Sequence, residues 1–212
     1  FAEACLERNA TILPFVGTNN SARDIDTIRR ALGEEQISFF GFSYGSELGG
    51  AWATLFPGTV RALVFDGAVD PNANGVEASR QQMAGFEAAL SAFLADCSAD
   101  DECAFHNDGD AESAFDALMA SLDATPIVGG ADRPLVNRDV ARTAVAKALY
   151  LDAYWPALAK SLAQAQAGDG SGLLALYDAY YERQAGGTWG NELEAFQVIE
   201  CMDRPVRPTV AE

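Results

Sequence analysis

The sequence has the composition of a globular protein. It contains 212 residues, of which 49% are apolar and 21% are charged, and these proportions exclude a disordered, collagen-like or coiled-coil chain. The formal net charge of −17 repels phosphate backbones and anionic lipid surfaces, and no cluster of Lys or Arg reverses it locally. No apolar stretch approaches the roughly 20 residues that a membrane-spanning helix requires. We therefore expect neither a nucleic-acid partner nor a membrane span.

The four cysteines and the single histidine bear on compartment and cofactors. Cys97 and Cys103 are too far apart for a C-x-x-C redox or zinc motif, so we expect a short-loop disulfide; reduced, buried thiols are the alternative that the spacing leaves open. A disulfide indicates an oxidising compartment, and we expect a secreted or cell-envelope protein. With one histidine the chain has too few closely spaced ligands for a Cys/His zinc site, and no metal or other cofactor is expected.

Residues 20–66 predict alternating helices and strands. Asn20 and Ser21 are expected to cap a helix whose apolar residues recur at helical spacing until Gly33 ends it. The aromatic segment 36–42 is typical of a buried strand, residues 44–56 of a helix and residues 60–65 of a second strand. This order predicts a doubly wound parallel α/β sheet.

The character of the sequence changes after residue 71. Strand patterns nearly vanish, and alanine-rich helical periodicity predicts a helical subdomain. We expect three parts: residues 1–71 as a partial α/β core, 72–205 as a helical lid, and 206–212 as the start of a return to the core. The helices expected in the lid are 77–96, 110–122, 138–149, 155–166, 171–183 and 191–202.

The segment that carries chemistry is Gly41-Phe-Ser-Tyr-Gly45, which matches G-x-S-x-G. It lies between a predicted strand and a predicted helix, which is the context of a nucleophile elbow. A sharp turn there strains the serine, and glycines on both sides remove Cβ atoms that would clash. Ser43 is then the expected nucleophile, and the backbone N–H of Tyr44 at the helix N-terminus is the expected oxyanion donor. The alternative is a helix N-cap serine in a tight turn.

Several segments around this motif resemble one branch of the α/β-hydrolase fold, the tripeptidyl aminopeptidases and proline iminopeptidase-like enzymes. The similarity is strongest in residues 41–49, 55–57 and 60–71, and it extends to 18–24 and 198–205. The resemblance implies an α/β-hydrolase fold with an α-helical lid, Ser43 as nucleophile and Tyr44 as oxyanion donor. It also implies a peptide substrate with a free N-terminus, cleaved through an acyl-enzyme.

Other parts of the family pattern are missing. Members of the fold place several strands and an oxyanion loop before the elbow, and the triad Asp and His after later strands. Only 42 residues precede Ser43, the chain begins with Phe1 rather than Met, and it ends while still resembling a lid. We therefore expect an internal fragment that is inactive in isolation. His106 is a weaker alternative for the base, because its Asn/Asp/Gly-rich loop is typical of a solvated histidine.

Acidic residues near the end of the predicted lid are candidates for substrate recognition. An enzyme that trims peptides from the amino end must bind an ammonium group, which a carboxylate does by charge-assisted hydrogen bonds. Asp203 and Glu200, three residues apart on one helical face, are the candidates; solvated surface carboxylates are the alternative. Asp66 and Asp70 are expected to shape a turn, and the role of Glu47 is left open.

The sequence leaves other functions open. The same elbow serves a carboxylesterase acting on small esters, and a hydrolase-like shell without a working triad would be a non-catalytic binding module. Cys5 lies before the first segment of similarity and Cys201 lies in the last one, and a disulfide between them would fasten the end of the lid to the core. Two unrelated thiols are the alternative.

Overall fold

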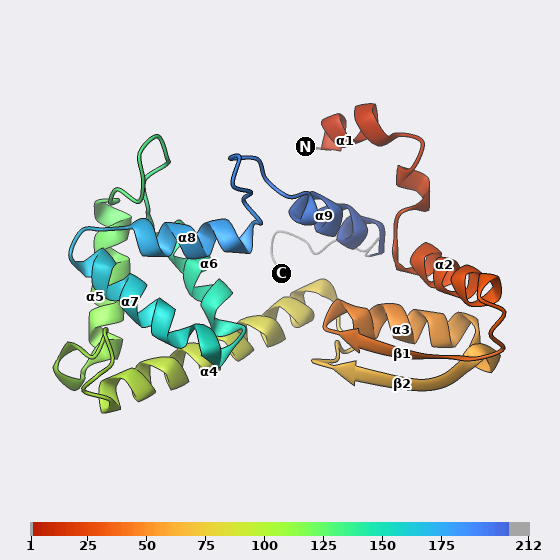
Figure 1. Ribbon diagram of the computed structural model, residues 1–212, viewed down its shortest axis with the longest axis horizontal. Helices are drawn as coiled ribbons and strands as arrows, with labels where there is room; N and C mark the ends of the chain where they lie inside the picture. Colours follow the sequence, from red (N-terminus) through yellow and green to blue (C-terminus); the bar gives the residue numbers. More distant parts are fainter. Residues whose placement is uncertain (1, 204–212) are drawn as a thin grey trace. The chain divides into compact units, whose positions relative to one another are not determined.

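The computed structural model describes residues 2–203 and divides the chain into two compact units (Figure 1). The first unit comprises residues 1–80 and 193–212, and the second residues 81–192. The helices and strands are α1 (Ala2–Asn9), α2 (Thr18–Ala31), β1 (Ile37–Phe42), α3 (Tyr44–Leu55), β2 (Val60–Asp66), α4 (Gly75–Ala99), α5 (Ala111–Ala124), α6 (Arg138–Leu149), α7 (Trp155–Gln166), α8 (Ser171–Tyr180) and α9 (Glu192–Asp203).

A β-α-β unit forms the centre of the first unit. Strands β1 and β2 are parallel, with Phe39 paired to Leu63 and Phe42 to Asp66, and α3 connects them. Helix α3 contacts both strands, and α2 packs on α3 (Figure 1). The predicted alternation of helices and strands over residues 20–66 is therefore confirmed, together with the α/β class.

The two faces of the sheet have different surroundings. On one face the Phe39 ring lies 6.2 Å from the fully buried ring of Trp52 in α3. On the other face the side chains of Phe40, Phe42 and Val64 are 55%, 64% and 51% exposed. The expectation that residues 36–42 form a buried strand is therefore correct for one face only. Parallel sheets in α/β proteins are normally covered on both faces. The strands of this sheet carry apolar side chains on both faces, but within residues 2–203 only the face toward α3 is covered.

Helix α2 begins before the expected cap, with Gly17 and not Asn20 or Ser21 as the N-cap residue. The sequence predicted a cap at Asn20 and Ser21, but the helix starts at Thr18 after Gly17, and no side chain of the N-cap residue accepts a hydrogen bond. The backbone N–H of Thr18 instead donates to the carboxylate of Asp203 in α9, at 2.9 and 3.1 Å. The prediction was wrong because the capping group comes from the far end of the sequence.

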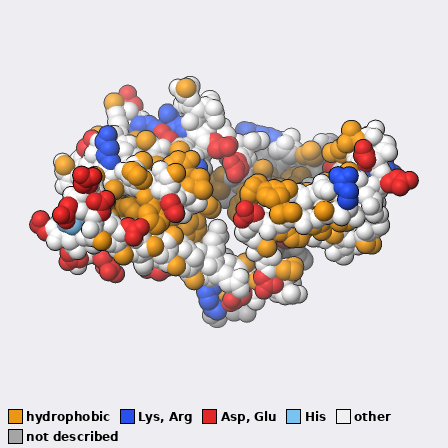
Figure 2. Space-filling view, turned by 60° about the horizontal axis from the view of Figure 1, so that its bottom comes forward, with side chains coloured by type: hydrophobic (Ala, Val, Ile, Leu, Met, Phe, Trp, Pro, Cys, Tyr) orange, Lys and Arg blue, Asp and Glu red, His pale blue; other side chains and the backbone are white. Residues whose placement is uncertain are grey.

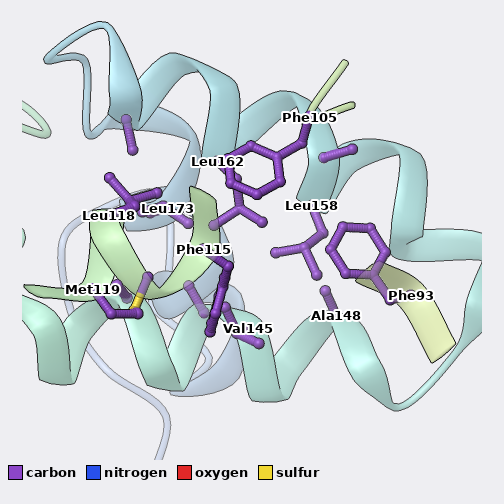
Figure 3. Close-up of a cluster of buried hydrophobic side chains, with 14 of the residues drawn as sticks. Phe93, Phe105, Phe115, Leu118, Met119, Val145, Ala148, Leu158, Leu162 and Leu173 are labelled. Carbon is purple, nitrogen blue, oxygen red and sulfur yellow. The ribbon is translucent and has the colours of Figure 1, made fainter. Parts of the chain in front are cut away.

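The second unit contains most of α4 and all of α5 to α8, whereas α9, the last helix predicted for the lid, belongs to the first unit. All six predicted helices are present, with ends within three residues of the expected positions. Asp110 and Asn137 cap α5 and α6 by accepting from backbone N–H groups of the first turns. Phe93, Phe105 and Leu158 point into a common apolar core among the helices of the second unit (Figure 3). The sequence did not predict α1.

The disulfide expected between Cys97 and Cys103 is formed. It closes the end of α4 onto the loop that leads to α5. The Cys5–Cys201 bridge stays a prediction.

The compact units and the predicted parts of the chain have different boundaries. The units divide between Arg80 and Gln81, inside α4, and between Glu192 and Leu193, so α9 groups with the β-α-β unit. The predicted boundaries lay after residues 71 and 205. Which residues act as a lid stays a prediction, and the expected return to the core at 206–212 lies outside the described residues.

The surface follows the composition. Carboxylate side chains are spread over the face shown in Figure 2, and Lys and Arg side chains are few and scattered there. Over residues 2–203, no helix is both long enough and apolar enough to cross a bilayer.

Leu158 tests the core of the second unit. Its side chain is fully buried, so Leu158→Ala removes three buried carbons and leaves a cavity, with an expected loss of about 2–5 kcal/mol in the free energy of unfolding. The control is Leu151→Ala, where the side chain is 57% exposed and the expected change is within about 0.5 kcal/mol. Urea denaturation measures both, and equal losses would contradict the packing described.

Candidate active site

Ser43 lies at the junction between β1 and α3 with a backbone that L-residues rarely adopt. Its φ is 48° and its ψ is −119°, and it directly precedes the first helical residue, Tyr44. Its N–H donates to the carbonyl oxygen of Asp66 at 2.9 Å, which continues the pairing of β1 with β2 by one residue. The residue is exposed. A non-glycine residue held in such a conformation costs about 1–3 kcal/mol, and such strain gathers at functional sites.

Gly41 allows the turn to close. A Cβ atom added to Gly41 would lie 2.4 Å from the carbonyl oxygen of Gly45 and 2.7 Å from the Phe39 ring. The backbone of α3 therefore approaches β1 so closely at Gly41 that no residue with a Cβ atom fits there. A Cβ added to Gly45 would have no neighbour within 4 Å. The expected clash is confirmed for Gly41 and wrong for Gly45, because the close contact involves the carbonyl group of Gly45 and not its Cα.

Ser46 fixes the first turn of α3. Its buried hydroxyl donates to the carbonyl oxygen of Ser43 at 2.6 Å and accepts from the backbone N–H of Val69 at 2.9 Å. The loop that follows β2 is thereby attached to the elbow. Ser46 was not predicted from the sequence; the signal that could have found it is a small hydroxyl residue three positions after the candidate nucleophile, where its oxygen reaches backbone groups of the turn.

Tyr44 connects the elbow to α2 and α9. Its phenolic hydroxyl is within hydrogen-bond distance of the Thr18 hydroxyl, which donates to Asp203 Oδ2 at 2.5 Å. Burial is the main cause that raises the pKa of the Tyr44 phenol; the hydrogen bond with Thr18 lowers it, and the negative charges of Asp203, Glu47 and Glu200 raise it further. The phenol is therefore protonated at neutral pH and is a hydrogen-bond donor.

Both predicted recognition residues, Asp203 and Glu200, lie near the Tyr44 side chain. Asp203 contacts Thr18 as described, and Glu200 lies one turn earlier in α9 and is half-buried. Glu47 lies one turn into α3, on the same side as Tyr44. Since the negative charges of all three carboxylates act on the Tyr44 phenol, the structure brings these acidic side chains together around the Tyr44 side chain. The assignment of Asp203 and Glu200 to substrate binding stays a prediction.

The other candidates have local partners. Asp70 Oδ1 accepts from the N–H of Asn72 at 2.9 Å, as expected of a residue that shapes a turn. His106 lies in the second unit, with Nδ1 3.0 Å from the carbonyl oxygen of Cys97 and Nε2 3.4 Å from Asp101 Oδ1. Because a carbonyl only accepts, Nδ1 carries the proton. His106 as a triad base stays a prediction.

The geometry of the elbow suits acyl transfer. The exposed Ser43 side chain stands at the carboxyl end of a parallel strand, where α/β sheets place their sites. The N–H of Tyr44 belongs to the first turn of α3 and has no acceptor within that helix. An N–H in this position, supported by the helix dipole, can stabilise a developing oxyanion. A serine hydroxyl also needs a base, and the sequence contains one histidine, His106.

Comparisons with known proteins point to the same chemistry. Residues 15–165 match the family model of the alpha/beta hydrolase fold. The chain is 35% identical over 219 aligned residues to the serine protease Hip1 of Mycobacterium tuberculosis, and 38% identical over 207 to carboxylesterase B of the same species. It is 44% identical over 89 residues to the tripeptidyl aminopeptidase of Streptomyces lividans. The resemblance to tripeptidyl aminopeptidases is confirmed.

The matches cover the chain and only part of each relative. The alignments with Hip1 and carboxylesterase B include 97% and 96% of this chain, and 41% and 40% of those relatives. The alignment with the tripeptidyl aminopeptidase includes 41% of this chain and 17% of the relative. The chain therefore spans about two fifths of the length of the first two proteins.

The two glycines of the elbow make a matched test. Gly41→Ala places a methyl group against the backbone of Gly45, which cannot move away as a flexible side chain can. We expect a loss of at least about 3 kcal/mol in the free energy of unfolding, at the upper end for overpacking, or failure to fold. Gly45→Ala has open space and a helical position, and its expected effect is within about 1 kcal/mol. Denaturation curves of both variants that coincide would contradict the close approach.

Proposed function

Because the chain belongs to the α/β-hydrolase fold family, we propose that it carries the nucleophile of a serine aminopeptidase. The observation that carries the proposal is the strained, exposed Ser43 at a strand-to-helix turn, with the N–H of Tyr44 beside it. Ser43 Oγ bonds to the scissile carbonyl carbon and gives its proton to a base, while the Tyr44 N–H stabilises the oxyanion. The amine then leaves with a proton from the same base, and water hydrolyses the acyl-enzyme.

The remaining catalytic groups are assigned to sequence outside this chain. In this fold the acid and histidine follow the nucleophile after later strands, and a second oxyanion N–H comes from an earlier loop. The partial coverage of the relatives and the open face of the sheet are consistent with this assignment. We propose that residues 2–203 alone are inactive and that no cofactor takes part. The helical second unit is proposed as the lid.

A preference for substrates with a free N-terminus is supported by the acidic group beside the elbow. Asp203, Glu200 and Glu47 give the surroundings of Tyr44 a negative potential, which favours an ammonium group over a neutral acyl group. Glu200 and Asp203 are the proposed recognition residues. A location outside the cytosol, secreted or in the cell envelope, is supported by the Cys97–Cys103 disulfide.

One relative favours a second candidate function. The 38% identity to carboxylesterase B extends over 96% of the chain, and a nucleophile elbow cleaves esters and amides alike. In an esterase acting on small esters, a negative charge that binds an ammonium group would not contribute to substrate binding. The two functions therefore differ in how they respond to a blocked N-terminus.

Acetylation of the substrate N-terminus tests the proposal. In the polypeptide extended to include the remaining catalytic groups, we expect kcat/KM for a chromogenic peptide amide to fall about 100-fold on acetylation, the usual cost of losing one partner of a desolvated charge pair. Glu200→Gln should reduce this ratio about tenfold. The control is Glu194→Gln on the exposed part of the same helix. Equal rates with free and acetylated peptides would refute the aminopeptidase assignment, and preferential turnover of small esters would favour the carboxylesterase.

A further inference from the structure

We propose that Thr18 and Asp203 are positioning residues that hold Tyr44, and with it the oxyanion side of the elbow, in place. This inference rests on the proposed function, because it assigns a catalytic role to the turn that contains Ser43. It adds to that function a tether between the elbow and helix α9, which is 140 or more residues away in the sequence. All three residues belong to the first compact unit.

The hydrogen bonds run in one direction. Thr18 has a single hydroxyl proton, and it donates that proton to Asp203 Oδ2. The contact between the hydroxyls of Thr18 and Tyr44 must then use the phenolic proton, with Tyr44 as donor and Thr18 as acceptor. The chain of donors therefore runs from Tyr44 through Thr18 to the carboxylate, and an ionised end point strengthens both bonds.

Asp203 is held firmly enough to serve as an anchor. Its carboxylate accepts from the backbone N–H and the hydroxyl of Thr18, and both lie at the N-terminus of α2, where the helix dipole favours a negative charge. Gly17 makes the approach possible: its φ is 132°, and a Cβ there would lie 2.9 Å from Asp203 Oδ1. Asp203, Thr18 and Tyr44 are thus joined by direct hydrogen bonds, with no further residue between them.

The tether acts on the residue next to the candidate nucleophile. Tyr44 shares a peptide bond with Ser43, whose φ of 48° would relax if the first turn of α3 could move. Fixing the ring of Tyr44 restricts that movement and keeps its N–H directed toward the proposed oxyanion. Since the oxyanion exists only in the transition state, loss of the tether should lower kcat and leave KM unchanged.

A neutral ester separates this role from recognition of the substrate ammonium. p-Nitrophenyl acetate has no amine, so the carboxylates near Tyr44 form no ion pair with it. In the extended polypeptide, Thr18→Val removes the relay and Tyr44→Phe removes the donor, while the charge of Asp203 stays. We expect each variant to lower kcat for the ester about 10- to 100-fold, as for a catalytic group displaced by a fraction of an ångström to 1 Å, with KM unchanged.

Combining the variants gives a second readout. If both hydroxyls act through one chain, the Thr18→Val/Tyr44→Phe double variant should lose no more than the worse single variant. Thr18→Ser keeps the hydroxyl and should restore kcat. The matched control is Thr27→Val, which removes a hydroxyl from the exposed face of the same helix, where it bonds to the carbonyl oxygen of Arg23.

The kinetic results distinguish a failure of the positioning role from a failure of the proposed function. Folded variants with unchanged kcat, or with a change in KM alone, would overturn it and leave the proposed function intact. If Thr18→Val does not fold, Tyr44→Phe decides alone, because it keeps the ring and removes only the hydroxyl. A wild-type polypeptide that turns over no ester and takes up no fluorophosphonate would refute the proposed function, and the positioning role with it.

Discussion

The close approach of α3 to the end of β1 is the constraint on which the candidate site depends. Gly41 lets the carbonyl group of Gly45 come within a distance that a Cβ would fill, and the single residue left to make the turn is Ser43. That residue adopts φ 48° because β1, paired to β2, fixes one side of it and the helix fixes the other. The exposure of its hydroxyl follows from this backbone geometry.

Polar contacts from distant segments hold the strained turn. Ser46 attaches it to the loop after β2, and Tyr44 reaches Thr18 and Asp203 at the start of α2 and the end of α9. These contacts also gather negative charge beside the elbow, because Asp203 and Glu200 come from α9 and Glu47 from α3. The same contacts therefore stabilise the first unit and surround the candidate nucleophile.

The sequence predicted the parts of the fold that depend on local pattern. Residues 37–66 alternate in the expected way, the elbow lies at the expected junction, and the helices of the second unit follow their apolar periodicity. It failed where a partner comes from far away. The start of α2 depends on Asp203, 185 residues from Thr18, and no periodicity within α2 could place that cap. The role given to Gly45 was wrong for a similar reason, since sequence shows a missing side chain but not which atom lies opposite it.

Reaction with a fluorophosphonate, followed by peptide mapping, tests the central claim most directly. In the polypeptide extended to include the triad acid and histidine, we predict one adduct, on Ser43, and none in the Ser43→Ala variant. Residues 1–212 alone should label far more slowly, because an unassisted serine hydroxyl is a poor nucleophile. Equal labelling of the 212-residue chain would return His106 to consideration as the base. No adduct on Ser43 in a folded, extended polypeptide would contradict the account and favour a hydrolase-like binding module.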